Sequence, residues 1–130
     1  MARNEHVELI RQGVAAWNGW RADNADHVPD LVGACLRGLD LTGANLDGAH
    51  LQEADLRGTI LRDARLVGAD LFAANLFKAV LDGANLDGAN LTDARFLECA
   101  QLTAARNWQS AFRDEGLACG APIRERRQRS

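Results

Sequence analysis

An imidazole between two carboxylates is the arrangement in this sequence that comes nearest to acid–base or metal chemistry. Asp30, His50 and Asp70 are spaced twenty residues apart, so a chain that brings every twentieth residue into one column would place them side by side. Such a column would stand on a flat wall, whereas catalysis favours a concave, desolvated site. We therefore interpret the three residues as a solvated surface column, and we predict no enzymatic activity, no metal site and no cofactor.

The cysteine content bears on the compartment in which the protein works. Cys35, Cys99 and Cys119 are an odd number of thiols with no Cys-x-x-Cys pair, which is typical of free cysteines in a reducing cytoplasm. The N-terminus shows no apolar signal-peptide segment, and no apolar run approaches the length of a membrane span. We therefore expect free thiols and a cytoplasmic location.

The twenty-residue spacing arises from a five-residue repeat. Leu stands at every fifth position from Leu31 to Leu91, and Phe96 takes the fourteenth place. Two residues before this place Ala occurs in eleven of the fourteen units, and two residues after it Gly occurs in eight. Polar residues flank most of the leucines, so each unit carries a Leu and a small residue that both need burial.

Neither a regular helix nor a flat strand buries such a repeat. A helix would distribute a five-residue period around its circumference, and its glycines would destabilise it by roughly 0.5–1 kcal/mol each. A flat strand would put successive leucines on opposite faces. A chain that turns a corner every five residues points every Leu and Ala inward, and four such sides make a coil of twenty residues. Stacked coils then pair along the axis at strand spacing.

Two segments carry the repeat almost without fault, ANLDGAHLQEADLRG (44–58) and ANLDGANLTDARF (84–96). They resemble the pentapeptide repeat family, whose units follow an A(D/N)LxG-like pattern. The resemblance implies an all-β solenoid, a right-handed quadrilateral β-helix of about 3.5 coils, which we expect to span residues 29–98.

A stack of coils exposes apolar ends and unpaired edges, so both flanks are expected to form capping helices. The N-terminal helix is predicted at 4–23, with Asn4 as its N-cap and one apolar stripe made by Val7, Ile10, Val14 and Trp17. The C-terminal helix is predicted at 100–114 from the spacing of Leu102, Ala105, Trp108 and Phe112. Both flanks resemble elements found in the family, the first in its cyanobacterial-type members. Residues 115–130 are expected to form a partly disordered tail with an arginine-rich end.

Several large apolar side chains fall on outward positions of an otherwise polar surface. They form a candidate interaction patch of Ile60, Phe72, Phe77, Val80 and Leu97. Two interpretations stay open at this point. Either the patch contacts a partner protein, or the C-terminal helix or residues 116–123 fold back and cover it.

Charge restricts the classes of function. The 130 residues hold 15 Lys and Arg against 18 Asp and Glu, a net charge of −3, whereas nucleic-acid binding needs a clustered basic field. We predict a non-catalytic interaction or scaffold module, monomeric or homodimeric, that binds an unknown protein and takes no small-molecule substrate, nucleic acid or membrane surface. The alternative comes from the resemblance, because some family members mimic duplex DNA and bind DNA gyrase. Weak net charge and short length disfavour it.

Overall fold

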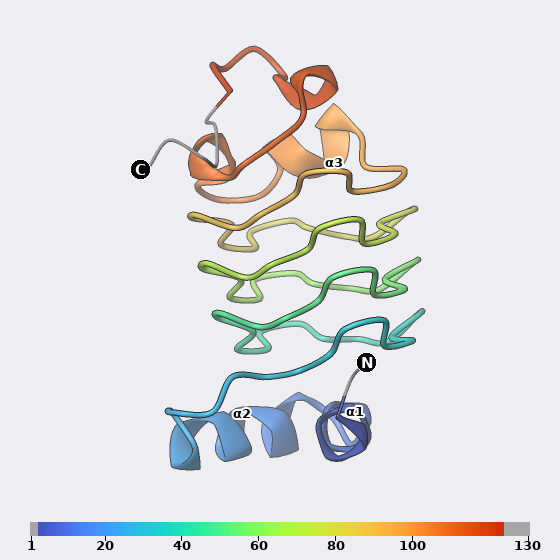
Figure 1. Ribbon diagram of the computed structural model, residues 1–130, viewed down its shortest axis with the longest axis vertical. Helices are drawn as coiled ribbons and strands as arrows, with labels where there is room; N and C mark the ends of the chain where they lie inside the picture. The colour runs from blue at the N-terminus through green and yellow to red at the C-terminus, as the bar shows by residue number, and fades with distance from the viewer. Residues whose placement is uncertain (1–2, 124–130) are drawn as a thin grey trace.

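The computed structural model describes residues 3–123, which form a stack of coils with helical segments at both ends (Figure 1). Helices α1 (Asn4–Arg11) and α2 (Val14–Asp23) lie against the first coil. Helix α3 (Cys99–Thr103) and the short 3-10 helices η1 (Trp108–Ser110) and η2 (Glu115–Leu117) lie at the opposite end. The two ends of the described chain are therefore at opposite ends of the long axis.

The coils are joined by parallel pairing between residues twenty positions apart. Each side of a coil contributes a single bridge, and the successive bridges build four columns: Asp30–His50–Asp70–Asn90, Cys35–Asp55–Asn75–Arg95, Asp40–Ile60–Val80 and Asn45–Arg65–Asn85. In each bridge, each of the two paired chain segments donates one backbone amide to a carbonyl of the other. The amide of Leu31 donates to the carbonyl of His50 at 2.8 Å, and the amide of His50 donates to Pro29 at 2.9 Å. Twenty residues are four five-residue units, and the bridges accordingly fall into four columns.

The interior of the stack is filled by the Leu and Ala positions of the repeat. Every Leu from Leu31 to Leu91 at five-residue spacing is at most 1% exposed. Thr59 takes an Ala place and is fully buried, and its hydroxyl donates to the carbonyl of Leu36 at 2.8 Å. Because that hydroxyl has an acceptor, a polar side chain is tolerated inside a core that is otherwise aliphatic.

The corners explain the glycine preference. The residue two places after each Leu, from Gly33 to Asp93, lies in the left-handed region with φ between 58° and 76°. Eight of these thirteen corners carry Gly, and side chains occupy the rest: Glu53, Asp63, Ala73, Lys78 and Asp93. A residue with a Cβ is strained in this conformation by roughly 1–2 kcal/mol. Glycine at a corner therefore relieves strain that the turn itself imposes.

The N-terminal region is helical as expected, but the prediction of one helix over 4–23 is wrong. Gln12 ends α1, and Gly13 adopts φ +119°, so the chain turns before α2 begins. Arg3 rather than Asn4 is the N-cap of α1. The apolar spacing runs through the break without interruption, which is why periodicity alone suggested a continuous helix.

Polar groups of α1 and α2 satisfy the free backbone edge of the first coil. Asn18 accepts from the amide of Asn45 at 2.8 Å and donates to the carbonyl of Gly43 at 3.0 Å. The indole of Trp17, which is fully buried, donates to the carbonyl of Asn45 at 2.8 Å. Three more side chains bond to backbone groups of this coil. His6 accepts from the amide of Asp30, Arg11 donates to the carbonyl of Cys35, and Arg21 donates to the carbonyl of Asp47. The two helices thus contact the first coil by hydrogen bonding as well as by apolar packing.

At the C-terminal end the predicted helix at 100–114 is also wrong. Within 100–114 the only α-helical residues are those of α3. The chain then pairs with the preceding coil, Arg106 with Asn85 and Phe112 with Asn90. These pairs are offset by 21 and 22 residues instead of 20. Pairing with earlier coils therefore extends past residue 98, the predicted end of the repeats, through a coil that contains inserted residues.

The first inserted residue is Phe96, and its insertion changes which side chain faces inward. Phe96 has φ 59° and is 60% exposed, whereas Leu97 is 9% exposed and joins the core. The expectation that Phe96 fills the fourteenth inward place and that Leu97 lies on the surface is therefore wrong. Phe96 is left-handed two positions before residue 98, where the next corner would fall, and the register moves by one residue, which exchanges the inward and outward places.

A disulfide joins Cys99 to Cys119, so the expectation of free thiols is wrong for these two residues. Cys35 is free and exposed. Next to the bridge, the buried Arg113 donates to the carbonyls of Gln109, Leu117, Ala118 and Pro122. Residues 115–123, which we expected to belong to a partly disordered tail, are therefore tied to the last coil. The arginine-rich end at 124–130 lies outside the described residues.

Corner strain is testable with a pair of Gly→Ala variants. Gly48 lies at a corner with φ +68° and no atom within 4 Å of an added Cβ, so Gly48→Ala should lower the free energy of unfolding by about 1–2 kcal/mol through backbone strain alone. Gly19 lies within α2 and is equally open, so Gly19→Ala should raise it by about 0.5–1 kcal/mol. Urea unfolding followed by circular dichroism measures both. Equal effects of the two substitutions would contradict the account of the corners.

The hydrogen-bonded cap makes a second prediction. Asn18→Ala removes both bonds to the first coil and should lower the free energy of unfolding by about 1–3 kcal/mol, because an amide and a carbonyl lose their partners. Gln12→Ala, at an exposed position between the helices, is the control and should change it little. Thermal unfolding of the two variants tests this, and a neutral Asn18→Ala would mean that water replaces the amide.

The disulfide between Cys99 and Cys119 leads to a third prediction. In the double variant Cys99→Ser/Cys119→Ser the unfolded chain regains the freedom of a loop with sequence separation 20, which should cost about 3 kcal/mol of stability. Cys35→Ser is the matched control. Hydrogen exchange should localise the loss of protection to residues 99–123, and unchanged protection there would show that Arg113 and the apolar contacts suffice.

Candidate functional site

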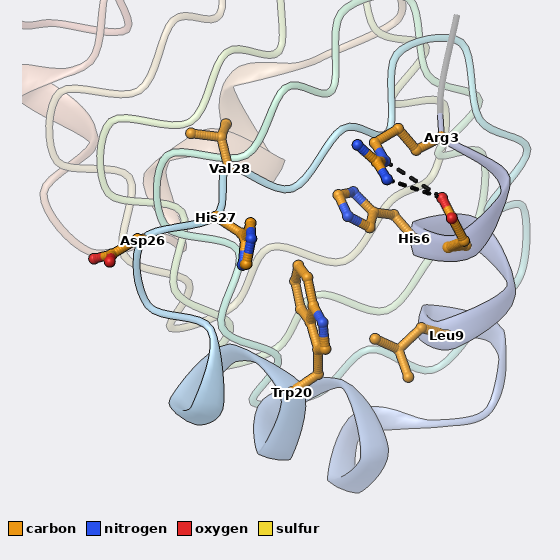
Figure 2. Close-up of a pocket in the computed structure, with 8 residues that line it drawn as sticks. Arg3, His6, Leu9, Trp20, Asp26, His27 and Val28 are labelled. Atoms are coloured by element: carbon orange, nitrogen blue, oxygen red, sulfur yellow. Dashed lines mark hydrogen bonds and ion pairs between the residues drawn. The ribbon is translucent and has the colours of Figure 1, made fainter.

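A hollow of about 470 Å³ lies between α1, α2 and the segment that leads to the first coil. Figure 2 shows Trp20 of α2 between His6 of α1 and His27 of that segment. The ring of Trp20 is 4.8 Å from that of His6 and 6.1 Å from that of His27. Above His6, the guanidinium of Arg3 pairs with Glu5 at 3.2 Å.

His6 is committed to holding the cap. Its Nδ1 accepts the backbone amide of Asp30 at 2.9 Å, so the proton of the neutral ring lies on Nε2. Burial, followed by the nearby charge of Arg3, lowers the pKa of His6 below its ordinary value. A neutral, oriented imidazole suits this structural bond, and the hollow is best explained as the joint between the cap and the stack. Sequence analysis gave no sign of His6, because its role depends on a backbone amide 24 residues away.

The column of Asp30, His50 and Asp70 forms as predicted. The carboxylate of Asp70 accepts from Gln52 at 3.0 Å and from Asn90 at 2.9 Å. Across residues 3–123, no hydrogen bond joins the His50 side chain to either aspartate. The column borders an open hollow of about 310 Å³. Among the described residues, the bond from Asn90 to Asp70 joins two side chains of the column.

The candidate patch is partly rearranged. Phe72 and Phe77 are 39% and 47% exposed, while Ile60 and Val80 are half-buried. Leu97 is buried, so its inclusion was wrong. Phe96 lies on the surface in its place and packs edge-on against Phe77, with ring centroids 5.8 Å apart. Sequence analysis missed Phe96 because it counted Phe96 as the fourteenth inward residue, whereas Phe96 is the inserted residue and Leu97 takes the inward place.

Cationic side chains surround this aromatic pair. The ammonium of Lys78 lies 5.5 Å from the ring of Phe77, and the guanidinium of Arg95 lies 5.8 Å from that of Phe96. Two shallow hollows meet here and share Phe77 and Lys78. One, of about 310 Å³, also has Phe96, Glu98 and Gln101, and the other, of about 330 Å³, has Arg37 and Arg57. We call Arg37, Arg57, Phe77, Lys78 and Phe96 the aromatic edge.

One cation of the aromatic edge is held by an acid, and two are not. Arg57 donates to both carboxylate oxygens of Asp55, at 2.8 and 2.7 Å. The hydrogen bond from Arg57 lowers the pKa of Asp55 to about 2, so this carboxylate is ionised at neutral pH. In the part of the chain that the structure describes, Arg37 and Lys78 have no ion-pair partner.

The C-terminal segment does not cover the aromatic edge. Phe77 and Phe96 remain exposed although residues 116–123 are in place. Leu117 of η2 is instead buried at the end of the stack, where Arg113 bonds to its carbonyl at 2.9 Å. Of the two interpretations of the patch, the intramolecular cover at 116–123 is therefore wrong.

The repeat and its stacked coils define the class of protein. The family model for pentapeptide repeats matches residues 30–63 and 69–106 with eight copies, which is more than half of the chain. The chain belongs to the pentapeptide repeat family. No curated protein matches it.

Solved structures of the same family are similar to this chain. A pentapeptide repeat protein from the thylakoid lumen of Arabidopsis thaliana is 26% identical, with a TM-score of 0.45, over 73% of this chain and 68% of that one. One from Nostoc is 30% identical, with a TM-score of 0.37, over 85% of this chain and 95% of that one. One from the cyanobacterium Cyanothece is 32% identical, with a TM-score of 0.30, over 63% and 54%.

Two findings bear on location. Within residues 3–123 no helix is long and apolar enough to cross a membrane. The disulfide between Cys99 and Cys119 removes one ground for expecting a cytoplasmic protein, because that expectation rested in part on free thiols.

Proposed function

We propose that this pentapeptide repeat protein is a non-catalytic interaction module that binds another protein through the aromatic edge. The observation that carries the proposal is the exposed pair of Phe77 and Phe96, which are 47% and 60% exposed and pack against each other at 5.8 Å. Paired aromatic rings bury much area at low cost in side-chain entropy, and such residues dominate binding energy at protein interfaces. A rigid backbone beneath them favours recognition of one shape.

We also propose the finer architecture that the family resemblance implies, a right-handed quadrilateral β-helix. Four columns of parallel bridges with an offset of twenty residues support it. In this architecture the faces are flat and the corners project, so a corner that carries two phenylalanines is well placed to contact a partner. The disulfide favours a compartment that permits disulfides over the reducing cytoplasm.

The absence of catalysis is part of the proposal and rests on what the titratable groups do. His6 holds a backbone amide, and Asp70 accepts from Gln52 and Asn90. Each of these groups has a structural role that accounts for its position. The DNA-mimic alternative needs an acidic face, whereas Arg37, Arg57 and Lys78 make this edge cationic, so no observation among the described residues favours it.

Removal of the aromatic rings tests the proposal. Phe77→Ser/Phe96→Ser should reduce binding of the partner at least about tenfold, because each interface aromatic contributes more than about 1 kcal/mol. Phe72→Ser is the matched control, since Phe72 is also an exposed phenylalanine and does not border either hollow of the edge. Affinity capture with each form of the protein, followed by quantitative mass spectrometry, measures the effect.

The fold of each variant is checked first by its unfolding transition. A partner that the wild type and Phe72→Ser capture and the double variant loses supports the proposal. Equal capture by all three forms would move the binding surface away from the aromatic edge.

A further inference from the structure

We infer that the aromatic edge recognises an acidic peptide segment with one aromatic or branched aliphatic side chain as its anchor. The inference rests on the proposed function and adds the chemistry of the partner. It follows from the charge, the spacing and the rigidity of the edge.

The edge has the opposite charge to the chain as a whole. Arg37, Arg57 and Lys78 line the two hollows, and Arg95 lies against Phe96, whereas the acids next to them are Asp55 and Glu98. These four cations and two acids leave an excess of two positive charges on a protein of net charge −3. Complementary potentials at an interface steer the encounter and exclude wrong partners, so the sign at this edge favours an acidic partner.

Two of the cations, Arg37 and Arg57, form a line that leads away from the aromatic pair. Arg37, Arg57 and Phe77 occupy the same corner in successive coils, because Gly38 donates to the carbonyl of Arg57 at 3.0 Å and Gly58 donates to that of Phe77 at 2.9 Å. Adjacent coils are about 4.8 Å apart, so the two arginines start about 5 and 10 Å from the phenylalanine. An extended peptide rises about 3.3 Å per residue. A peptide along the axis with its anchor against Phe77 therefore reaches Arg37 with an acid about three residues away.

The pocket for the anchor has fixed walls. Gln101 of α3 donates to the carbonyls of Leu76 and Ala79, at 2.9 and 3.0 Å, and accepts from the backbone amide of Glu98 at 2.8 Å. The disulfide at Cys99 attaches the same short helix to Cys119 in the segment after η2. A surface that is already ordered loses little conformational entropy on binding. The hollow beside Phe77 and Phe96 is therefore suited to one inserted side chain.

Other occupants fit the edge less well. The arginine-rich sequence at 124–129 has the same sign of charge as the edge, so electrostatic repulsion disfavours it as the occupant. A nucleic acid would supply anions and stacking bases, but Asp55 already engages Arg57 and Glu98 lines the hollow beside the rings, so acids interrupt the cations of the edge. Clustered basic fields are what nucleic acids require.

A random peptide display library is the probe for the inference. Peptides are selected on the immobilised full-length protein and counter-selected on Phe77→Ser/Phe96→Ser. The expected result is enrichment of peptides with several Asp or Glu residues and one aromatic or branched aliphatic residue, with acids two to three positions from it. Enriched peptides without an excess of acids would overturn the inference.

Synthetic copies of an enriched peptide then test the role of the arginines. Arg37→Glu should weaken its binding at least tenfold, and the loss should shrink at high salt. Arg62→Glu, an exposed arginine that borders neither hollow of the edge, is the control and should leave the affinity within about twofold. Equal loss in both variants would show a general charge effect and overturn the inference.

Two outcomes separate this inference from the proposed function. Peptides that need Phe77 and Phe96 but carry no acids would leave the aromatic edge as a protein-binding surface and refute only the acidic partner. A fluorescent single-stranded oligonucleotide that binds tightly and competes for Phe77 would overturn both, because the edge would then serve nucleic acid. Absence of any peptide that depends on the two phenylalanines would overturn the inference, while affinity capture of natural partners still tests the proposed function.

Discussion

Hydrogen bonding between residues twenty positions apart is the constraint on which every other feature of this protein depends. It requires the chain to return to the same column after four corners, and each corner of the regular part requires a left-handed residue. With the corners fixed, Leu and Ala can only point inward, and the polar residues between them can only point outward. Core, surface columns and glycine positions are therefore consequences of one register.

The caps follow from the same constraint, because a register that joins coil to coil leaves the outermost coils without a neighbour. At the N-terminal end, side chains of α1 and α2 stand in for the missing coil, with Asn18 imitating both a donor and an acceptor. At the C-terminal end the chain pairs once more through Arg106 and Phe112, with a looser offset, and a disulfide closes the segment. The two ends thus meet the same requirement in different ways.

Much of the fold could be predicted from the sequence because the same residue types recur at every fifth position. Period five and the inward Leu and Ala follow from spacing alone, whereas the column of Asp30, His50 and Asp70 also needs four sides in each coil, which the family resemblance implied. The features that could not be predicted depend on the backbone conformation of single residues. Gly13 interrupts the helix that the apolar spacing predicted as continuous, and Phe96 points outward because it is itself left-handed. The candidate patch was therefore right at Phe77 as an exposed apolar residue and wrong at Leu97, and the aromatic pair itself was not visible.

The twenty-residue offset also restricts how such a chain can change in length during evolution. Loss or duplication of a whole coil returns every remaining side chain to its own column, whereas loss of a single unit moves each later residue to the neighbouring face. A surface assembled from one column, such as that of Arg37, Arg57 and Phe77, would survive the first kind of event and be dispersed by the second. The heritable unit of length in this fold is therefore the coil, although the unit that repeats in the sequence is five residues.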